Sequence, residues 1–97
     1  MTAALQLGPT SIVVIPRGVR LHHDQIRKLW VLLAPERTIN LDQTGLAILN
    51  QIDGKRPFQT IIDRLAALYD APADQISDDV HTFVIGLMKR RILDVTR

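Results

Sequence analysis

Residues 28–41 read KLWVLLAPERTINL, and this stretch decides the fold. Its first seven residues are almost all apolar, which is typical of a strand in the middle of a sheet. Pro35 and Glu36 then end that strand, because proline has no backbone N–H to donate to a sheet. From Arg37 to Leu41 apolar and polar residues alternate, as they do in a strand with one buried face. The stretch therefore predicts two antiparallel strands, 28–34 and 37–41, joined by a tight turn.

The residues before this stretch predict a third strand and a separate extended segment. Residues 18–22 alternate in the same way, and Asp24 and Gln25 supply a turn. Residues 11–15 are mostly β-branched and lie between Pro9 and Pro16, so we interpret residues 1–15 as an extended N-terminal arm and 16–97 as a single domain. Because an unpaired strand invites pairing with another copy of the chain, a homodimer that exchanges this arm is a hypothesis.

After Asp42 the apolar period changes from two to about 3.6 residues, which predicts helices at about 42–53, 58–69 and 74–91. Asp42 is a suitable N-cap for the first helix, and Gly54 suits its end. The second helix has an apolar stripe, formed by Ile61, Ile62, Leu65, Leu68 and Tyr69. Together the elements predict an α+β fold, with strands over about 18–41: an N-terminal three-stranded antiparallel sheet packed on a C-terminal three-helix bundle, winged-helix-like.

The composition argues against catalysis and against a bound cofactor. The chain has no cysteine, its five glycines are scattered, and its two serines, Ser11 and Ser77, lie in no nucleophile motif. His22, His23 and Asp24 are the one cluster of ligand-type side chains, but neighbouring strand residues point to opposite faces, so we expect no metal site. We interpret Trp30, in its apolar strand, as a core residue. No apolar run approaches the roughly 20 residues that span a bilayer, and we expect a cytoplasmic protein without membrane contact.

A sheet followed by three helices also fits a winged-helix regulator, so nucleic-acid binding is the alternative function. The distribution of charge argues against it. Bases outnumber acids near both ends of the chain, but the third helix starts with Asp74, Asp78 and Asp79. These acids would repel phosphates where a DNA-reading helix docks, so no nucleic-acid partner is expected.

The chain resembles the PqqD family, the peptide carriers of pyrroloquinoline quinone biosynthesis. The most specific part is residues 30–36, WVLLAPE, which follow RLHHD at 20–24. The likeness continues through Asp53-Gly54 and the apolar residues of the second and third helices to about residue 93. The family usually has an aromatic residue where this chain has His23, and a glycine near Arg91. Pro57 also stands where a Ser or Thr cap is common, although proline suits a first helical turn.

The resemblance implies a carrier without catalytic activity that recognises a PqqA-type precursor peptide and hands it to a PqqE-type radical-SAM enzyme, to which the iron–sulfur cofactors belong. Strand addition supplies a mechanism, because the outer strand of a three-strand meander leaves unpaired N–H and C=O groups. The peptide would then lie between this strand and the third helix. We expect Ile39→Pro to abolish binding by removing a backbone donor. The expected peptide-binding residues are Arg37, Thr38, Ile39, Asn40 and Leu41 on the strand, and Asp79, Phe83, Leu87 and Arg90 on the third helix.

Overall fold

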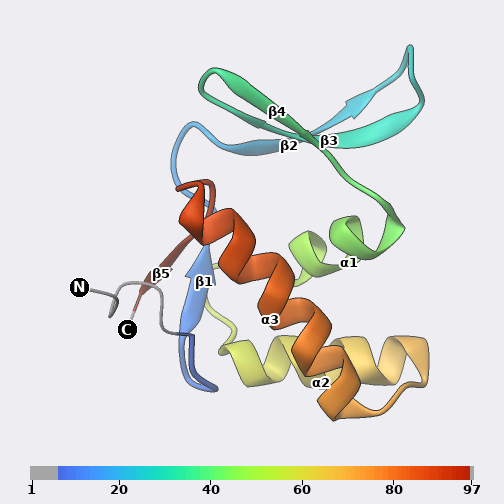
Figure 1. The fold of residues 1–97 in the computed structure, drawn as a ribbon, viewed down its shortest axis with the longest axis vertical. Coiled ribbons are helices and arrows are strands. Elements are labelled where there is room, and N and C mark those ends of the chain that lie inside the picture. The colour runs from blue at the N-terminus through green and yellow to red at the C-terminus, as the bar shows by residue number, and fades with distance from the viewer. Residues whose placement is uncertain (1–6, 97) are drawn as a thin grey trace.

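A computed structural model describes residues 7–96; residues 1–6 and 97 lie outside the described residues. Its elements are β1 (Ile12–Val14), β2 (Arg20–Asp24), β3 (Leu29–Ala34), β4 (Arg37–Asn40), α1 (Gln43–Gln51), α2 (Phe58–Tyr69), α3 (Ala73–Lys89) and β5 (Asp94–Thr96). Figure 1 shows the sheet of β2, β3 and β4 above the helices, with α3 running diagonally from the end of α2 toward the sheet. The predicted α+β class, with three helices and a three-stranded sheet, is confirmed. The winged-helix likeness stays a prediction.

The three-stranded sheet is an antiparallel meander in the order β2-β3-β4. Leu32 of β3 lies opposite Leu21 of β2 and Ile39 of β4, so these three side chains share one face. Leu32 is fully buried, and Leu21 and Ile39 pack against the same core. This face therefore joins the sheet to the helices, as the alternation in the sequence predicted.

The two turns of the meander are formed by residues that the sequence marks. The Asp24 carboxylate accepts hydrogen bonds from the backbone N–H groups of Ile26 and Arg27, both at 3.0 Å. Pro35 precedes Glu36, whose positive φ of 64° matches the third position of a type II turn. Both turns are short and local, so the sequence alone was enough to predict them.

The segment that we expected to be a free arm is part of the packed domain, which corrects that prediction for residues 7–15. β1 pairs with β5 in an antiparallel two-stranded sheet, and Val13 is buried opposite Val95. The carbonyls of Ser11 and Pro9 accept hydrogen bonds from the N–H groups of Phe58 and Gln59, at 2.7 and 2.9 Å. They satisfy the first amides of α2, whose N-cap Pro57 has no side-chain cap.

Strand β5 was missing from the prediction, and α3 ends earlier than expected. The predicted helix ran to residue 91, but α3 ends at Lys89, and Arg91 adopts a left-handed conformation with φ 60°. A glycine is the usual residue in this conformation at the end of a helix, which explains the glycine expected near this position. The left-handed turn redirects the chain through the buried Ile92 and Leu93 into β5.

Three apolar residues that we predicted to be buried are exposed. Trp30 keeps 39% of its surface because it lies two residues before Leu32, near the turn between β2 and β3. Its ring contacts His23, with centroids 5.0 Å apart and the ring planes tilted by 55°. Leu68 and Tyr69, in the last turn of α2, keep 65% and 45% of their surface. The helical stripe predicted the face correctly, but it could not show where the neighbouring helices stop.

Candidate functional site

The outer side of β4 is an open sheet edge. Within residues 7–96 no strand pairs with β4 on the side away from β3. The N–H of Leu41 donates to the carbonyl of Trp30 at 3.0 Å. Hydrogen-bonded and non-hydrogen-bonded pairs alternate along an antiparallel ladder, so Ile39 bonds inward to Leu32, while Thr38 and Asn40 turn their N–H and C=O groups to the open side.

The end of β4 adjoins a hollow. Asn40, Leu41, Asp42 and Phe83 line this space, which we call the sheet-side hollow. Phe83 comes from α3, so the hollow lies between the end of β4 and that helix. A chain that paired with β4 would therefore have an aromatic wall beside it.

The start of α1 holds Phe83 in this position. The Asp42 carboxylate caps α1 by accepting a hydrogen bond from the N–H of Gly45 at 2.7 Å. A Cβ atom on Gly45 would lie only 3.1 Å from the ring of Phe83. Glycine at this position thus lets the first turn of α1 lie directly against Phe83. Phe83 in turn lines the sheet-side hollow.

The structure brings some of the predicted site residues together and separates others. Asn40, Leu41 and Phe83 line one hollow, and Thr38 lies on the same open edge. Ile39 is half-buried against the core, and Leu87, with 4% of its surface exposed, is a core residue under the site rather than on its surface. Asp79 lines a second hollow. Arg37 and Arg90 are exposed.

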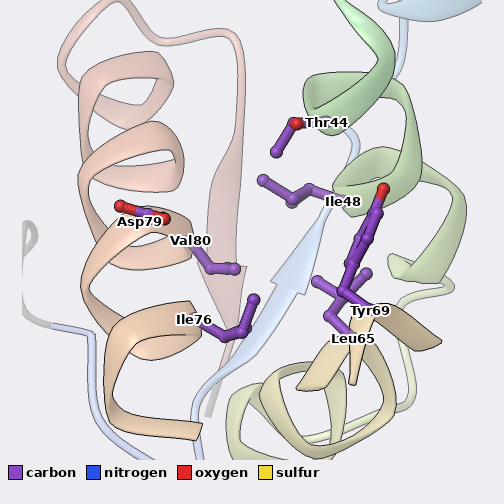
Figure 2. A pocket seen from close by; sticks show the side chains of 7 residues that line it. All are labelled: Thr44, Ile48, Leu65, Tyr69, Ile76, Asp79 and Val80. Carbon is purple, nitrogen blue, oxygen red and sulfur yellow. The ribbon is translucent and has the colours of Figure 1, made fainter. Parts of the chain in front are cut away.

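The second hollow lies among the three helices, and no sequence pattern indicated it. We call it the three-helix hollow; its lining residues are Thr44, Ile48, Leu65, Tyr69, Ile76, Asp79 and Val80. Figure 2 shows Ile76 and Val80 of α3 pointing across it toward Ile48 of α1 and Leu65 of α2, with the ring of Tyr69 beside Ile48. Only the exposed side chain of Tyr69 could have suggested it, and exposure is not visible in a sequence.

The charge along α3 changes sign from one end to the other. Asp74, Asp78 and Asp79 are exposed in its first half, and Lys89 and Arg90 are exposed at its end. The basic end of α3 points toward the sheet, and the acidic end follows the turn after α2 (Figure 1). A ligand along α3 would therefore meet acids at one end and bases at the other.

The turn between β2 and β3 reaches the end of β4 through Arg27. Its guanidinium donates to the Asp24 carboxylate at 3.0 Å and to the side-chain oxygen of Asn40 at 3.1 Å. The backbone N–H of Arg27 and then its side chain, both donating to the carboxylate, lower the pKa of Asp24. The Asn40 side chain is thus held on the outer face of the sheet, and its backbone remains on the open edge.

Neither a metal cluster nor a membrane span is found in the described part of the chain. No group of three or more His, Cys, Asp or Glu side chains in residues 7–96 has the geometry to hold an ion. Every helix in that range is too short or too polar to cross a bilayer.

Comparison with known proteins gives a consistent family. Residues 30–93 match the sequence model of "PqqD: Coenzyme PQQ synthesis protein D (PqqD)". A "PqqA binding protein" of Rhizobium meliloti (strain 1021) is 43% identical, with full coverage of both chains. The "Bifunctional coenzyme PQQ synthesis protein C/D" of Methylorubrum extorquens is 41% identical over 82% of this chain and 22% of that longer protein.

Two solved structures share the fold. The solution NMR structure of the PqqD part of Methylobacterium extorquens PqqCD, a stand-alone recognition element for ribosomally synthesized and modified peptides (RiPPs), has a TM-score of 0.81 and 36% identity. It covers 97% of this chain and 99% of that chain. The crystal structure of PqqD from Xanthomonas campestris has a TM-score of 0.56 and 40% identity, over 81% and 88% of the two chains.

Proposed function

The chain belongs to the PqqD family, and on that premise we propose that it is a non-catalytic carrier that binds a PqqA-type precursor peptide by strand addition at β4. It then presents the peptide to a PqqE-type radical-SAM enzyme in pyrroloquinoline quinone biosynthesis. The observation that carries the proposal is the open edge of β4 beside the sheet-side hollow. Relatives of this chain are named PqqA binding proteins, which supports the choice of ligand.

Backbone pairing supplies the affinity in this proposal. The N–H and C=O groups of Thr38 and Asn40 bond to the peptide main chain, and alternate peptide side chains settle against Phe83 in the sheet-side hollow. A paired stretch of four or five residues is small by the standards of stable interfaces, so we expect an affinity on the order of micromolar. Such an affinity also lets the peptide leave for the enzyme.

The charges at the basic end of the site suit an acidic stretch of the peptide. Arg37 lies on the helix-facing side of β4, since it lies two residues before Ile39, and Arg90 lies at the end of α3. Neither forms an ion pair within residues 7–96. Both guanidinium groups are therefore available to carboxylates of a bound peptide.

A carrier of this kind helps the enzyme by ordering the peptide before the reaction. A free peptide loses conformational entropy when it enters an active site, and ordering on the carrier reduces that cost at the enzyme. The chemistry and its cofactors belong to the enzyme. Because the precursor is made on ribosomes, we place the complex in the cytoplasm.

Substitution at Thr38 tests the proposal. Thr38→Pro removes an N–H that faces the open side, and proline is tolerated on edge strands in that orientation. We expect it to weaken binding of the synthetic PqqA-type peptide by about tenfold or more, measured by calorimetry, because a backbone bond is lost and the ring obstructs the edge. Thr38→Ala keeps the N–H and is the matched control, with an expected change within about twofold. Equal affinity of the proline and alanine variants would refute strand addition at β4.

The register of β3 and β4 changes what the Ile39→Pro variant tests. The N–H of Ile39 faces β3, so proline at position 39 breaks the sheet itself rather than the open edge. We still expect loss of binding, but with loss of β4 pairing to β3. The spectrum of the isotope-labelled protein would show this as large shifts across the meander without peptide.

The alternative, a winged-helix regulator that binds nucleic acid, gains no support from the exposed acids of α3. A gel-shift at low salt with duplex DNA distinguishes the two functions, and we expect no retardation. Retardation together with unchanged spectra on addition of peptide would favour the regulator instead.

We also propose that a homodimer, where it forms, exchanges β1 between two copies of the chain. Exchange would reproduce the same β1–β5 pairs between two chains. A dimer that persists after removal of residues 1–15, measured by light scattering, would contradict this arrangement.

A further inference from the structure

The three-helix hollow is an open, mostly apolar space that residues 7–96 do not fill. It encloses about 140 Å³, and its floor is formed by the buried side chains of Ile48, Leu65 and Val80. A cavity of roughly 150 Å³ lined by apolar side chains holds a benzene-sized group. The hollow is therefore large enough for one aromatic or branched aliphatic side chain.

The hollow continues the line of the sheet-side hollow along α3. Asp79 lies one helical turn before Phe83 on α3, and Thr44 lies two residues after Asp42, the N-cap of α1. Both α3 and the start of α1 therefore supply lining residues to the two hollows, and Phe83 packs against Gly45 of α1. A chain that leaves the edge of β4 past Asn40 thus crosses Phe83 and arrives at the three-helix hollow.

The surroundings of the hollow are acidic. Asp79 lines it and is exposed, Asp42 lines the sheet-side hollow, and the exposed Asp74 and Asp78 precede Asp79 on α3. Within residues 7–96 none of these carboxylates forms an ion pair. These carboxylates would attract a bound peptide segment that contains basic residues and would repel a segment that contains acidic residues.

We propose that the three-helix hollow receives one apolar side chain, aromatic or branched aliphatic, from a basic segment of the peptide that pairs with β4. This inference rests on the proposed function. Every strand pair in the described chain is antiparallel, and antiparallel ladders are the more stable kind. A peptide antiparallel to β4 has its N-terminal side at Asn40, so the side chain in the hollow precedes the paired stretch.

The geometry fixes the spacing of the two parts of the peptide. Asp79 and Ile76 lie four and seven residues before Phe83, which corresponds to about 6 and 10 Å along the helix. An extended chain covers about 3.3 Å per residue. The apolar residue should therefore stand about two or three positions before the peptide residue that lies over Phe83.

The experiment titrates the isotope-labelled protein with the synthetic PqqA-type precursor peptide, and with the same peptide shortened stepwise from its N-terminus. The methyl signals of Ile48, Ile76 and Val80 report the hollow, and the amide signals of Thr38 and Asn40 report the edge of β4. We expect the full peptide to shift both sets. The shortened peptides should keep the amide shifts, lose the methyl shifts and bind about tenfold more weakly, as expected for loss of one buried apolar side chain.

Two matched pairs of surface variants test the hollow from the protein side. Tyr69→Ala removes a wall of the hollow, and Leu68→Ala removes an even more exposed neighbour that does not line it. Asp79→Lys reverses the charge at the rim, and Asp78→Lys makes the same change outside the lining. We expect the first variant of each pair to weaken binding about threefold or more, and the second to change it less than twofold.

Three results have distinct meanings. Shifts of amides and methyls that respond to the N-terminal truncation as described support the inference. Amide shifts alone, or methyl shifts that persist in the shortest peptide, overturn the inference and leave the carrier function in place. No shift in either set overturns the carrier function, and the inference with it.

Discussion

Two short strands, β1 and β4, have similar lengths and opposite roles. β1 is closed: β5 pairs with it, Val13 is buried, and the carbonyls before it cap α2. β4 is open: β3 pairs with one side, the other side has no strand within residues 7–96, and only Ile39 of its four residues is shielded from solvent. An edge closed by the chain itself contributes stability, whereas an edge left open is available to a foreign main chain.

The largest expected effect tests the closed strand. Val13→Ala removes two methyl groups from a side chain with 1% of its surface exposed, so it should lower the free energy of unfolding by about 2–3 kcal/mol. Urea unfolding followed by Trp30 fluorescence measures the change. Thr38→Ala on the exposed open strand is the control and should stay within about 0.5 kcal/mol. If both variants cost the same, the distinction between the two strands is wrong.

The next largest effect concerns the turn at Arg91, which connects α3 to β5. Arg91 holds a left-handed conformation that glycine adopts without strain, so Arg91→Gly should stabilise the protein by about 1 kcal/mol. For a chain of this length that corresponds to a rise in Tm of about 4–8 °C, measured by thermal unfolding. Arg90→Gly is the matched control, because Arg90 has negative φ and should lose stability on the same change.

A smaller effect sharpens the description of the open strand. Arg37→Glu should weaken binding of an acidic peptide about threefold at low salt and leave unfolding unchanged, because Arg37 is exposed on the helix-facing side of the open edge. Arg20→Glu makes the same change on the opposite face, where Arg20 pairs with Leu33. Equal losses in the two variants would mean that net charge, rather than position, attracts the peptide.

The smallest expected effect concerns the pH dependence of the stability of the folded chain. The pKa of Asp24 lies below its usual 3.8 in the folded chain, so its stabilising contribution is complete above the unfolded value and disappears as the pH falls through the lower folded value. Asp24→Asn should therefore flatten the pH dependence of Tm below about pH 4. Asp63→Asn makes the same substitution at an exposed acid without an ion-pair partner within residues 7–96 and is the control. An identical profile in the Asp24 variant would mean that the contacts of Asp24 with Arg27 do not stabilise the folded chain.

Local patterns predicted most of the elements and grouped some residues that line the sheet-side hollow. The span of α2, the turn at Pro35 and Glu36, the cap at Asp42 and the inward face of Ile39 all depend on neighbours within a few residues, so they could be read from the sequence. Asn40, Leu41 and Phe83, which the prediction grouped as peptide-binding residues, line one hollow in the structure, and their binding role stays a prediction. Leu87 was also expected to contact the peptide, but only 4% of its surface is exposed, and the depth of a side chain is not visible in a helical period.

The amino-acid sequence by itself determined where strands give way to helices, because the change of period at Asp42 is a local property of the chain. Tertiary structure alone decided that β1 would be closed by β5, that Trp30 and Tyr69 would stay exposed, and that three helices would leave a hollow between them. The reason is physical: periodicity shows which way a side chain points. What it meets there, and whether a strand edge finds a partner, depends on segments more than 80 residues apart in the chain, as Val13 and Val95 are.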